Sequence, residues 1–205
     1  MSGDGKIIAI VGNTGVGKTT LARRLGARAP FRTLLEQHEE RPFQRLFTQD
    51  LRRYALANQV DYLLFRAEQE RWIRQGGGIG VQDGGLEMDF HVFTRLFYER
   101  GYLAEAEYGL CERLYTLLRT ELPPPDILVW LRAPLEVVAE RFSRRVRRLS
   151  IAACEDLQSL ERLLCRWLEN ERRVPVVRLD ASEDDPTYAA ALDGLLTMLS
   201  DALGA

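Results

Sequence analysis

The chain has 205 residues, of which 46% are hydrophobic and 28% are charged, as in a globular protein rather than a disordered or fibrous one. Its 28 basic and 30 acidic residues give a net charge of −2, which argues against a general nucleic-acid coat and a polybasic membrane anchor. No signal peptide is recognisable, and no apolar run approaches the roughly 18 residues that span a bilayer. We therefore expect one soluble, cytoplasmic domain over residues 1–205.

Short apolar runs alternate with helical patterns along the chain. Strands are predicted at residues 6–11, 31–36, 78–83, 126–133 and 174–181. Helices are predicted after the first glycine-rich turn, over 43–75 with a break near Gln49 and Asp50, over 90–100, 104–121, 135–148 and 155–172, and from Pro186 onward. This alternation predicts an α/β fold in three layers, with a five-stranded parallel sheet covered by helices on both faces.

The turn after the first strand, GNTGVGKT at residues 12–19, matches the phosphate-loop pattern G-x-x-x-x-G-K-[ST] in full. Its glycines let backbone N–H groups converge on a triphosphate at a helix N-terminus, while Lys18 supplies charge near the β and γ phosphates and Thr19 offers its hydroxyl to Mg²⁺. We expect a P-loop NTPase-type fold. The predicted ATP-binding residues are Gly12, Asn13, Thr14, Gly15, Val16, Gly17, Lys18, Thr19 and Thr20.

No NKxD guanine signature is present, and the chain leaves little room for the extra domains of motors, so a small-molecule kinase is the leading interpretation.

Two acidic residues lie at the ends of predicted strands. Glu36 ends the second strand and Asp83 the third, and in a parallel sheet the ligand crevice lies outside these ends. We predict Glu36 as the general base and Asp83 as a Mg²⁺ ligand with Thr19. The alternatives are a solvated loop acid and a turn cap.

An amide and several arginines complete the candidate site. Gln59 and Arg66 are seven residues apart on one helix face, where they could bind a nucleobase edge or simply form a polar stripe. Residues 141–148 carry five arginines, and a lid at about 141–152 could bring Arg141, Arg145 and Arg147 to the phosphates. A solvated helix end and an RNA-binding patch are the alternatives there.

In combination, these features resemble the deoxynucleoside kinase family over nearly the whole chain. The resemblance rests on the phosphate loop, Glu36, the spacing of Gln59 and Arg66, Asp89 six residues after Asp83, and the R-x-x-x-R-x-R pattern from Arg141. It implies that ATP phosphorylates the 5′-hydroxyl of a deoxynucleoside, with Glu36 as base, and that Gln59, Arg66 and Asp89 recognise the nucleobase. It also implies a homodimer through the helices near 43–75 and 90–121, with a nucleoside as partner. From the net charge and the lack of a long apolar run, we expect neither nucleic acid nor membrane as a partner.

The chain departs from the family pattern at three places. Gly84 and Gly85 follow Asp83 where the family usually has an arginine. Thr48 stands where the family has the tyrosine that touches the sugar 3′-hydroxyl, and Arg148, Leu149 and Ser150 replace an acidic pair. These departures leave open a divergent kinase, another P-loop kinase such as a nucleoside monophosphate kinase, or a degenerate protein that binds nucleotide without turnover.

Overall fold

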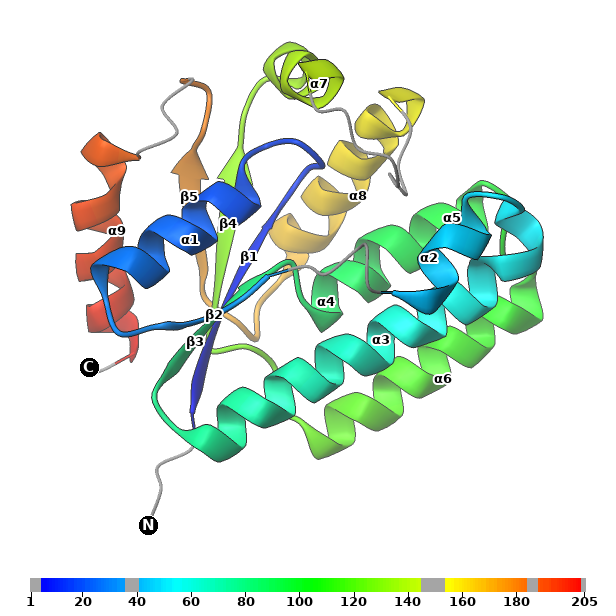
Figure 1. The fold of residues 1–205 in the computed structure, drawn as a ribbon, viewed down its shortest axis with the longest axis horizontal. Helices are drawn as coiled ribbons and strands as arrows, with labels where there is room; N and C mark the ends of the chain where they lie inside the picture. Colours follow the sequence, from blue (N-terminus) through cyan, green and yellow to red (C-terminus); the bar gives the residue numbers. More distant parts are fainter. Residues whose placement is uncertain (1–4, 36–40, 145–153, 184–187, 204–205) are drawn as a thin grey trace.

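The structure is a computed structural model that describes residues 5–35, 41–144, 154–183 and 188–203 (Figure 1). Its centre is a sheet of five parallel strands in the order β2-β3-β1-β4-β5, which confirms the predicted fold class. The strands are β1 (Lys6–Gly12), β2 (Arg32–Leu34), β3 (Ile79–Asp83), β4 (Ile127–Arg132) and β5 (Val176–Asp180).

The central strands β1, β3 and β4 are buried on both faces of the sheet. Successive side chains of a strand point to opposite faces, so Ile8 and Ile10 of β1 pack into one apolar cluster while Ala9 and Val11 pack into another. This two-sided burial explains why the strands appear in the sequence as nearly continuous apolar runs.

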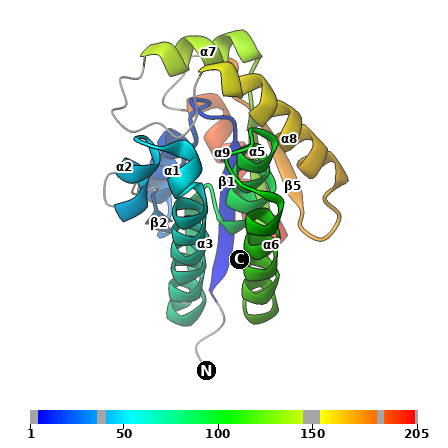
Figure 2. The same cartoon turned by 90° about the vertical axis from the view of Figure 1, so that its right-hand side faces the viewer.

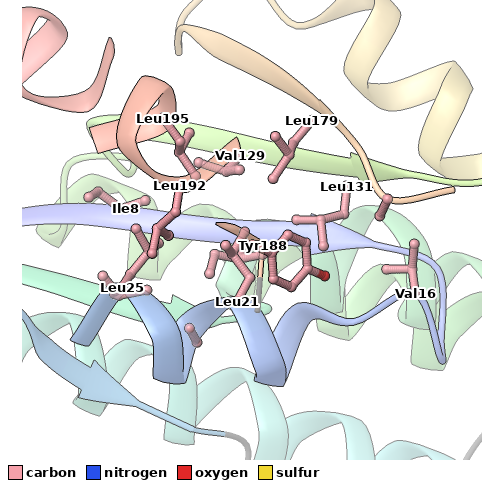
Figure 3. Close-up of a cluster of buried hydrophobic side chains, with 14 of the residues drawn as sticks. Ile8, Val16, Leu21, Leu25, Val129, Leu131, Leu179, Tyr188, Leu192 and Leu195 are labelled. Atoms are coloured by element: carbon pink, nitrogen blue, oxygen red, sulfur yellow. The ribbon is translucent and has the colours of Figure 1, made fainter. Parts of the chain in front are cut away.

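One face is covered by α1 (Lys18–Arg28) and α9 (Ala189–Leu203) (Figure 1). Leu21 and Leu25 of α1 and Leu192 and Leu195 of α9 join the sheet residues in one cluster, which Figure 3 shows together with Tyr188. The helix α7 (Leu135–Arg144) adds Val138 to this cluster.

The other face carries most of the helices. These are α2 (Pro42–Phe47), α3 (Leu51–Gly76), α4 (Leu86–Met88), the π-helical turn η2 (Asp89–Thr94), α5 (Arg95–Glu99), α6 (Glu105–Glu121), the 3₁₀ turn η3 (Cys154–Asp156) and α8 (Leu157–Asn170). Figure 2 shows α3 and α6 side by side. Within the described ranges, no helix has the length and apolar character needed to cross a membrane.

The element boundaries show where local signals were sufficient. The predicted break near Asp50 is confirmed, because the Asp50 side chain accepts a hydrogen bond from the Arg53 N–H and caps α3. Gly77, with φ of 66°, follows the last turn of α3. The predicted end of the second strand is wrong by two residues: β2 ends at Leu34, and Glu36 lies outside the described residues.

The helix predicted over 90–100 is also different in the structure. The chain is already helical at Leu86, and its turns widen to the π form at Asp89–Thr94 before α5 begins. Apolar periodicity does not distinguish a π turn from an α turn, and π turns often occur at functional sites. The part of the helix predicted to extend from 145 to 148 lies outside the described residues.

Candidate active site

The phosphate loop joins β1 to α1 and requires glycine at several positions. Gly15 and Gly17 have φ of +91° and +116°, which side chains disfavour. A Cβ atom on Gly12 would lie 2.6 Å from the Leu131 carbonyl oxygen, and one on Gly17 would collide with the Tyr188 hydroxyl. The loop is therefore packed closely against β4 and the residue that precedes α9.

Lys18 begins α1 and folds back over the loop. Its Nζ atom donates to the carbonyl oxygens of Gly12 and Asn13 at 3.0 and 3.1 Å. The ammonium group is thus held against the loop itself. Thr20 lies half-buried in the first turn of α1, and Val16 is buried in the apolar cluster beneath.

The side chain of Asn13 bonds to α8 and to the next residue of the loop. Its Nδ2 atom donates to the Leu157 carbonyl at 2.9 Å and to Glu161 Oε2 at 3.1 Å, both on α8. Its Oδ1 atom accepts the Thr14 N–H at 2.8 Å. The contribution of Asn13 to a nucleotide site would therefore come through its backbone.

Thr19 and Asp83 are brought together at the carboxyl end of the sheet. The Thr19 hydroxyl donates to Asp83 Oδ2, while Asp83 Oδ1 is buried and has no hydrogen-bond partner in the described part of the chain. A hydroxyl and a carboxylate oxygen are hard donors of the kind that Mg²⁺ prefers, and Mg²⁺ in kinases usually takes its remaining ligands from phosphates and water. The residues present fit a magnesium ion bound with a nucleotide.

The three residues expected to recognise the nucleobase bond to one another beside Gly84, the residue that follows Asp83. Arg66 Nε donates to Asp89 Oδ2 at 2.8 Å, and Gln59 Nε2 donates to the Asp89 carbonyl at 2.9 Å. Arg66 is only 1% exposed and also donates to Gln69 at 3.3 Å. We call Gln59, Arg66 and Asp89 the base-reading group.

The glycine that replaces the family arginine lies beside this group. A Cβ atom on Gly84 would be 3.0 Å from Arg66 Nη2, and Gly84 has φ of +90°. The Arg66 guanidinium therefore lies against the backbone at the place where the family has a second arginine. A larger residue at position 84 would require Arg66 to move.

Two further predicted residues, Thr48 and Arg141, make hydrogen bonds in other parts of the described structure. Thr48 is exposed, and its hydroxyl donates to the Arg45 carbonyl of its own helix. Arg141 donates to the carbonyls of Ala181 and Glu183, after β5, at 2.6 Å each. The remaining predicted site residues, Glu36, Arg145 and Arg147, lie outside the described residues.

Although Arg141 bonds elsewhere, its helix lies against the phosphate loop. A Cβ atom on Gly15 would be 3.4 Å from the Val138 carbonyl and 3.4 Å from Phe142 Cβ. The described end of α7 therefore lies next to the tip of the loop.

One buried amide was missed by sequence reasoning. Asn58, next to Gln59 on α3, is fully buried, and within the described residues neither of its amide atoms has a hydrogen-bond partner. Buried amides without partners are rare in folded proteins. In the sequence, Asn58 is one polar residue among many on a long helix, so only burial identifies it.

A second cluster missed by sequence reasoning joins three helices. Arg119 of α6 donates to both oxygens of Glu70 of α3, at 2.7 and 2.9 Å, and pairs with Glu87 of α4 at 2.8 Å. The Tyr115 hydroxyl donates to Glu87, and His91 Nε2 lies 3.4 Å from Glu87 Oε2. We call Glu70, Glu87, His91, Tyr115 and Arg119 the interhelical polar cluster.

The pKa values of the two carboxylates in this cluster are shifted in opposite directions. Burial raises the pKa of Glu70, and the hydrogen bonds and charge of Arg119 only partly oppose it. Burial acts on Glu87 in the same direction, but the hydrogen bond from His91, the charge of Arg119 and the Tyr115 hydroxyl outweigh it and lower the pKa of Glu87. Glu87 is thus held ionised two residues before Asp89.

Comparison with known proteins gives one consistent result. A family profile described as deoxynucleoside kinase matches residues 8–192. A deoxyadenosine/deoxycytidine kinase of Bacillus subtilis is 25% identical over 95% of this chain and 94% of its own. A deoxyadenosine kinase of Dictyostelium discoideum is 31% identical over 92% of this chain and 78% of its own.

Solved structures show the same fold. A deoxyadenosine kinase from M. mycoides, with dCMP and a flexible dCDP bound, superimposes with a TM-score of 0.81 at 22% identity, over 95% of this chain and 99% of its own. The structure of that kinase with dATP gives a TM-score of 0.80 at 21% identity over the same shares.

Proposed function

The chain belongs to the deoxynucleoside kinase family and is an ATP-dependent phosphotransferase acting on a deoxynucleoside, and from that premise we propose how its residues divide the reaction. The reaction moves the γ-phosphoryl group of ATP to the 5′-hydroxyl of the nucleoside, so the protein must position two substrates and balance the transferring charge. The observation that carries the proposal is the meeting of Thr19 and Asp83 at the phosphate loop, with Arg66 of the base-reading group beside Gly84, the residue after Asp83.

On the ATP side, the loop amides and Lys18 bind the phosphates. When phosphates enter, the Lys18 ammonium exchanges its bonds to the Gly12 and Asn13 carbonyls for bonds to phosphate oxygens. Thr19 and Asp83 would hold the Mg²⁺ ion, which neutralises charge on the phosphates. Arg141, Arg145 and Arg147, in a lid at about 141–152, stabilise the charge that moves during transfer.

On the acceptor side, Glu36 removes the proton of the 5′-hydroxyl, and Thr48 takes the position next to the sugar. The base-reading group favours adenine or cytosine. Because Nε2 of Gln59 donates to the Asp89 carbonyl, Oε1 is the atom of this amide that can accept a hydrogen bond from a base, which suits an exocyclic amino group. Arg66 carries only donors and suits the neighbouring ring nitrogen. The names of two relatives, the Bacillus subtilis deoxyadenosine/deoxycytidine kinase and the Dictyostelium deoxyadenosine kinase, support this preference.

A catalytically degenerate protein is the second candidate, and Gly84 favours it. The missing side chain removes one cation from the transfer site, although the Arg66 guanidinium lies beside the vacant position. A nucleoside monophosphate kinase would need additional cations for the acceptor phosphate.

Phosphoryl transfer from MgATP to each of the four deoxynucleosides and their monophosphates tests these alternatives. We expect turnover with deoxyadenosine or deoxycytidine and at least about a hundredfold loss of kcat in Lys18→Ala and Glu36→Gln. Lys6→Ala is the matched control, because Lys6 is the other lysine of the chain and pairs with Asp126 at the opposite end of β1. ATP binding without any turnover would favour the degenerate protein instead.

We also propose a single kinase domain over residues 1–205 that functions as a homodimer. Both α3 and α6 expose large apolar side chains: Leu64 and Trp72 on α3, and Leu110 and Leu117 on α6. Leu117 is 62% exposed. Leu110 and Leu117 are seven residues apart and lie on one face of α6. The two helices lie side by side at the edge of the molecule, where a second copy could cover them (Figure 2).

A further inference from the structure

The phosphate loop is fastened to a helix far away in the sequence by one side chain. Asn13 is 1% exposed, and its Nδ2 atom uses both of its hydrogens, one for the Leu157 carbonyl at 2.9 Å and one for Glu161 Oε2 at 3.1 Å. Both partners belong to the first turn and a half of α8, 144 and 148 residues away. A side chain that only filled space would not need this pair of polar partners.

The same residue also sets the inner geometry of the loop. The Asn13 carbonyl accepts the Lys18 Nζ atom at 3.1 Å and the Val16 N–H at 3.3 Å, and Asn13 Oδ1 accepts the Thr14 N–H at 2.8 Å. Three loop groups therefore take their position from Asn13, while Asn13 takes its position from α8. A shift of this residue would displace the Lys18 ammonium and the neighbouring amides together.

We propose that Asn13 is a positioning residue that fixes the phosphate loop by tethering it to Leu157 and Glu161 of α8. Preorganised donors in a phosphate site lose their effect when they must rearrange as the substrate binds. The tether therefore acts on ATP and on the transferred phosphoryl group, and not on nucleobase recognition. This inference rests on the proposed ATP site, and its test includes ATP binding measured without turnover.

Reversing the polarity of the tether provides the experiment. Asn13→Asp keeps an acceptor for the Thr14 N–H but removes the Nδ2 donor and places a carboxylate beside Glu161 and the Leu157 carbonyl. Glu161→Gln supplies a donor at the other end, so in the double variant Gln at 161 can donate to Asp at 13. Asn170→Asp at the end of α8, where Asn170 donates to the Arg166 carbonyl of its own helix, is the matched control.

The loss of two hydrogen bonds predicts at least about a tenfold increase in the Kd and KM for ATP in Asn13→Asp, with an unchanged deoxynucleoside KM. In Glu161→Gln and in Asn170→Asp, we expect the Kd for ATP to change by less than about threefold. In the double variant, we expect recovery of at least half of the lost ATP affinity, on a logarithmic scale. ATP Kd is measured by calorimetry without nucleoside, so it reports on the tether even if the wild-type protein shows no turnover.

Three outcomes would overturn the proposal. One is an unchanged ATP Kd in Asn13→Asp, which would mean that the loop holds its shape without the tether. Another is a double variant no better than Asn13→Asp alone. The third is an equal loss for ATP and deoxynucleoside together with a lowered melting temperature, which would assign Asn13 a general structural role.

Discussion

At the scale of single residues, the most informative side chain is the buried amide of Asn58. Its neighbour Gln59 bonds to Asp89, but within the described residues neither amide atom of Asn58 has a partner. An amide in that condition has lost its hydration and gained nothing in exchange, which costs stability. A protein keeps such a group where it serves a function, and Asn58 is adjacent on α3 to the base-reading group.

The prediction that follows is that Asn58→Leu makes the ligand-free protein more stable. Leucine has the same number of side-chain heavy atoms as asparagine, with the same branching, and needs no hydrogen-bond partner, so we expect the free energy of unfolding to rise by about 1–3 kcal/mol. Urea unfolding followed by circular dichroism measures the change, with Asn170→Leu, an exposed asparagine, as the control. A loss of stability would instead indicate that ordered water satisfies the Asn58 amide.

At the scale of secondary-structure elements, the interhelical polar cluster ties α3, α4 and α6 together, and the π-helical turn contributes His91 to it. Glu87 has its pKa lowered from the ordinary 4.5, so folding favours its ionised form. Its contribution to stability is therefore fully present above about pH 4.5 and is lost as the pH falls through the lower value of the folded state. Glu70, whose pKa is raised, has the opposite dependence.

We therefore expect Glu87→Gln to lose roughly 1–3 kcal/mol of stability at pH 7, because a charge-assisted network is broken, and to lose progressively less as the pH falls below 4.5. Denaturant unfolding between pH 7 and pH 3.5 measures the difference in the free energy of unfolding between the variant and wild type. The contribution of Glu70 is present in both proteins and largely cancels in this difference. Glu121→Gln on the exposed end of α6 is the control. A difference that stays constant with pH would rule out ionised Glu87 as the stabilising group.

The elements also show what the sequence can and cannot predict. The Asp50 cap, the glycines after α3 and the phosphate loop are local signals, so the sequence predicts them well. The seven-residue spacing of Gln59 and Arg66 placed both on one helix face, and the structure shows both bonded to Asp89. The Asn13 tether and the Glu87 cluster join residues that are distant in sequence, and local periodicity contains no information about such contacts.

At the scale of the whole molecule, the strand order explains why the candidate metal ligands meet. β1 pairs with β3 in a register that places Ile10 opposite Asp83, so Asp83 ends its strand two residues before the phosphate loop begins on the neighbouring strand. The helix α1 then starts at the loop and brings Thr19 within hydrogen-bonding distance of Asp83. The sequence predicts each strand end, but only the pairing of β1 with β3 makes the two ends neighbours.

The same whole-molecule view leads to a test of the proposed dimer. Leu117 is the most exposed of the large apolar side chains on α6, so Leu117→Glu should leave the protomer folded while placing a charge in the contact between two copies. We expect sedimentation or light scattering to give the mass of two chains for wild type and of one chain for Leu117→Glu. Met198→Glu is the control, because Met198 is also an exposed apolar residue but lies on α9, on the other side of the sheet. We expect this variant to remain dimeric. If both variants keep the wild-type mass, α6 is not the surface through which the chains associate.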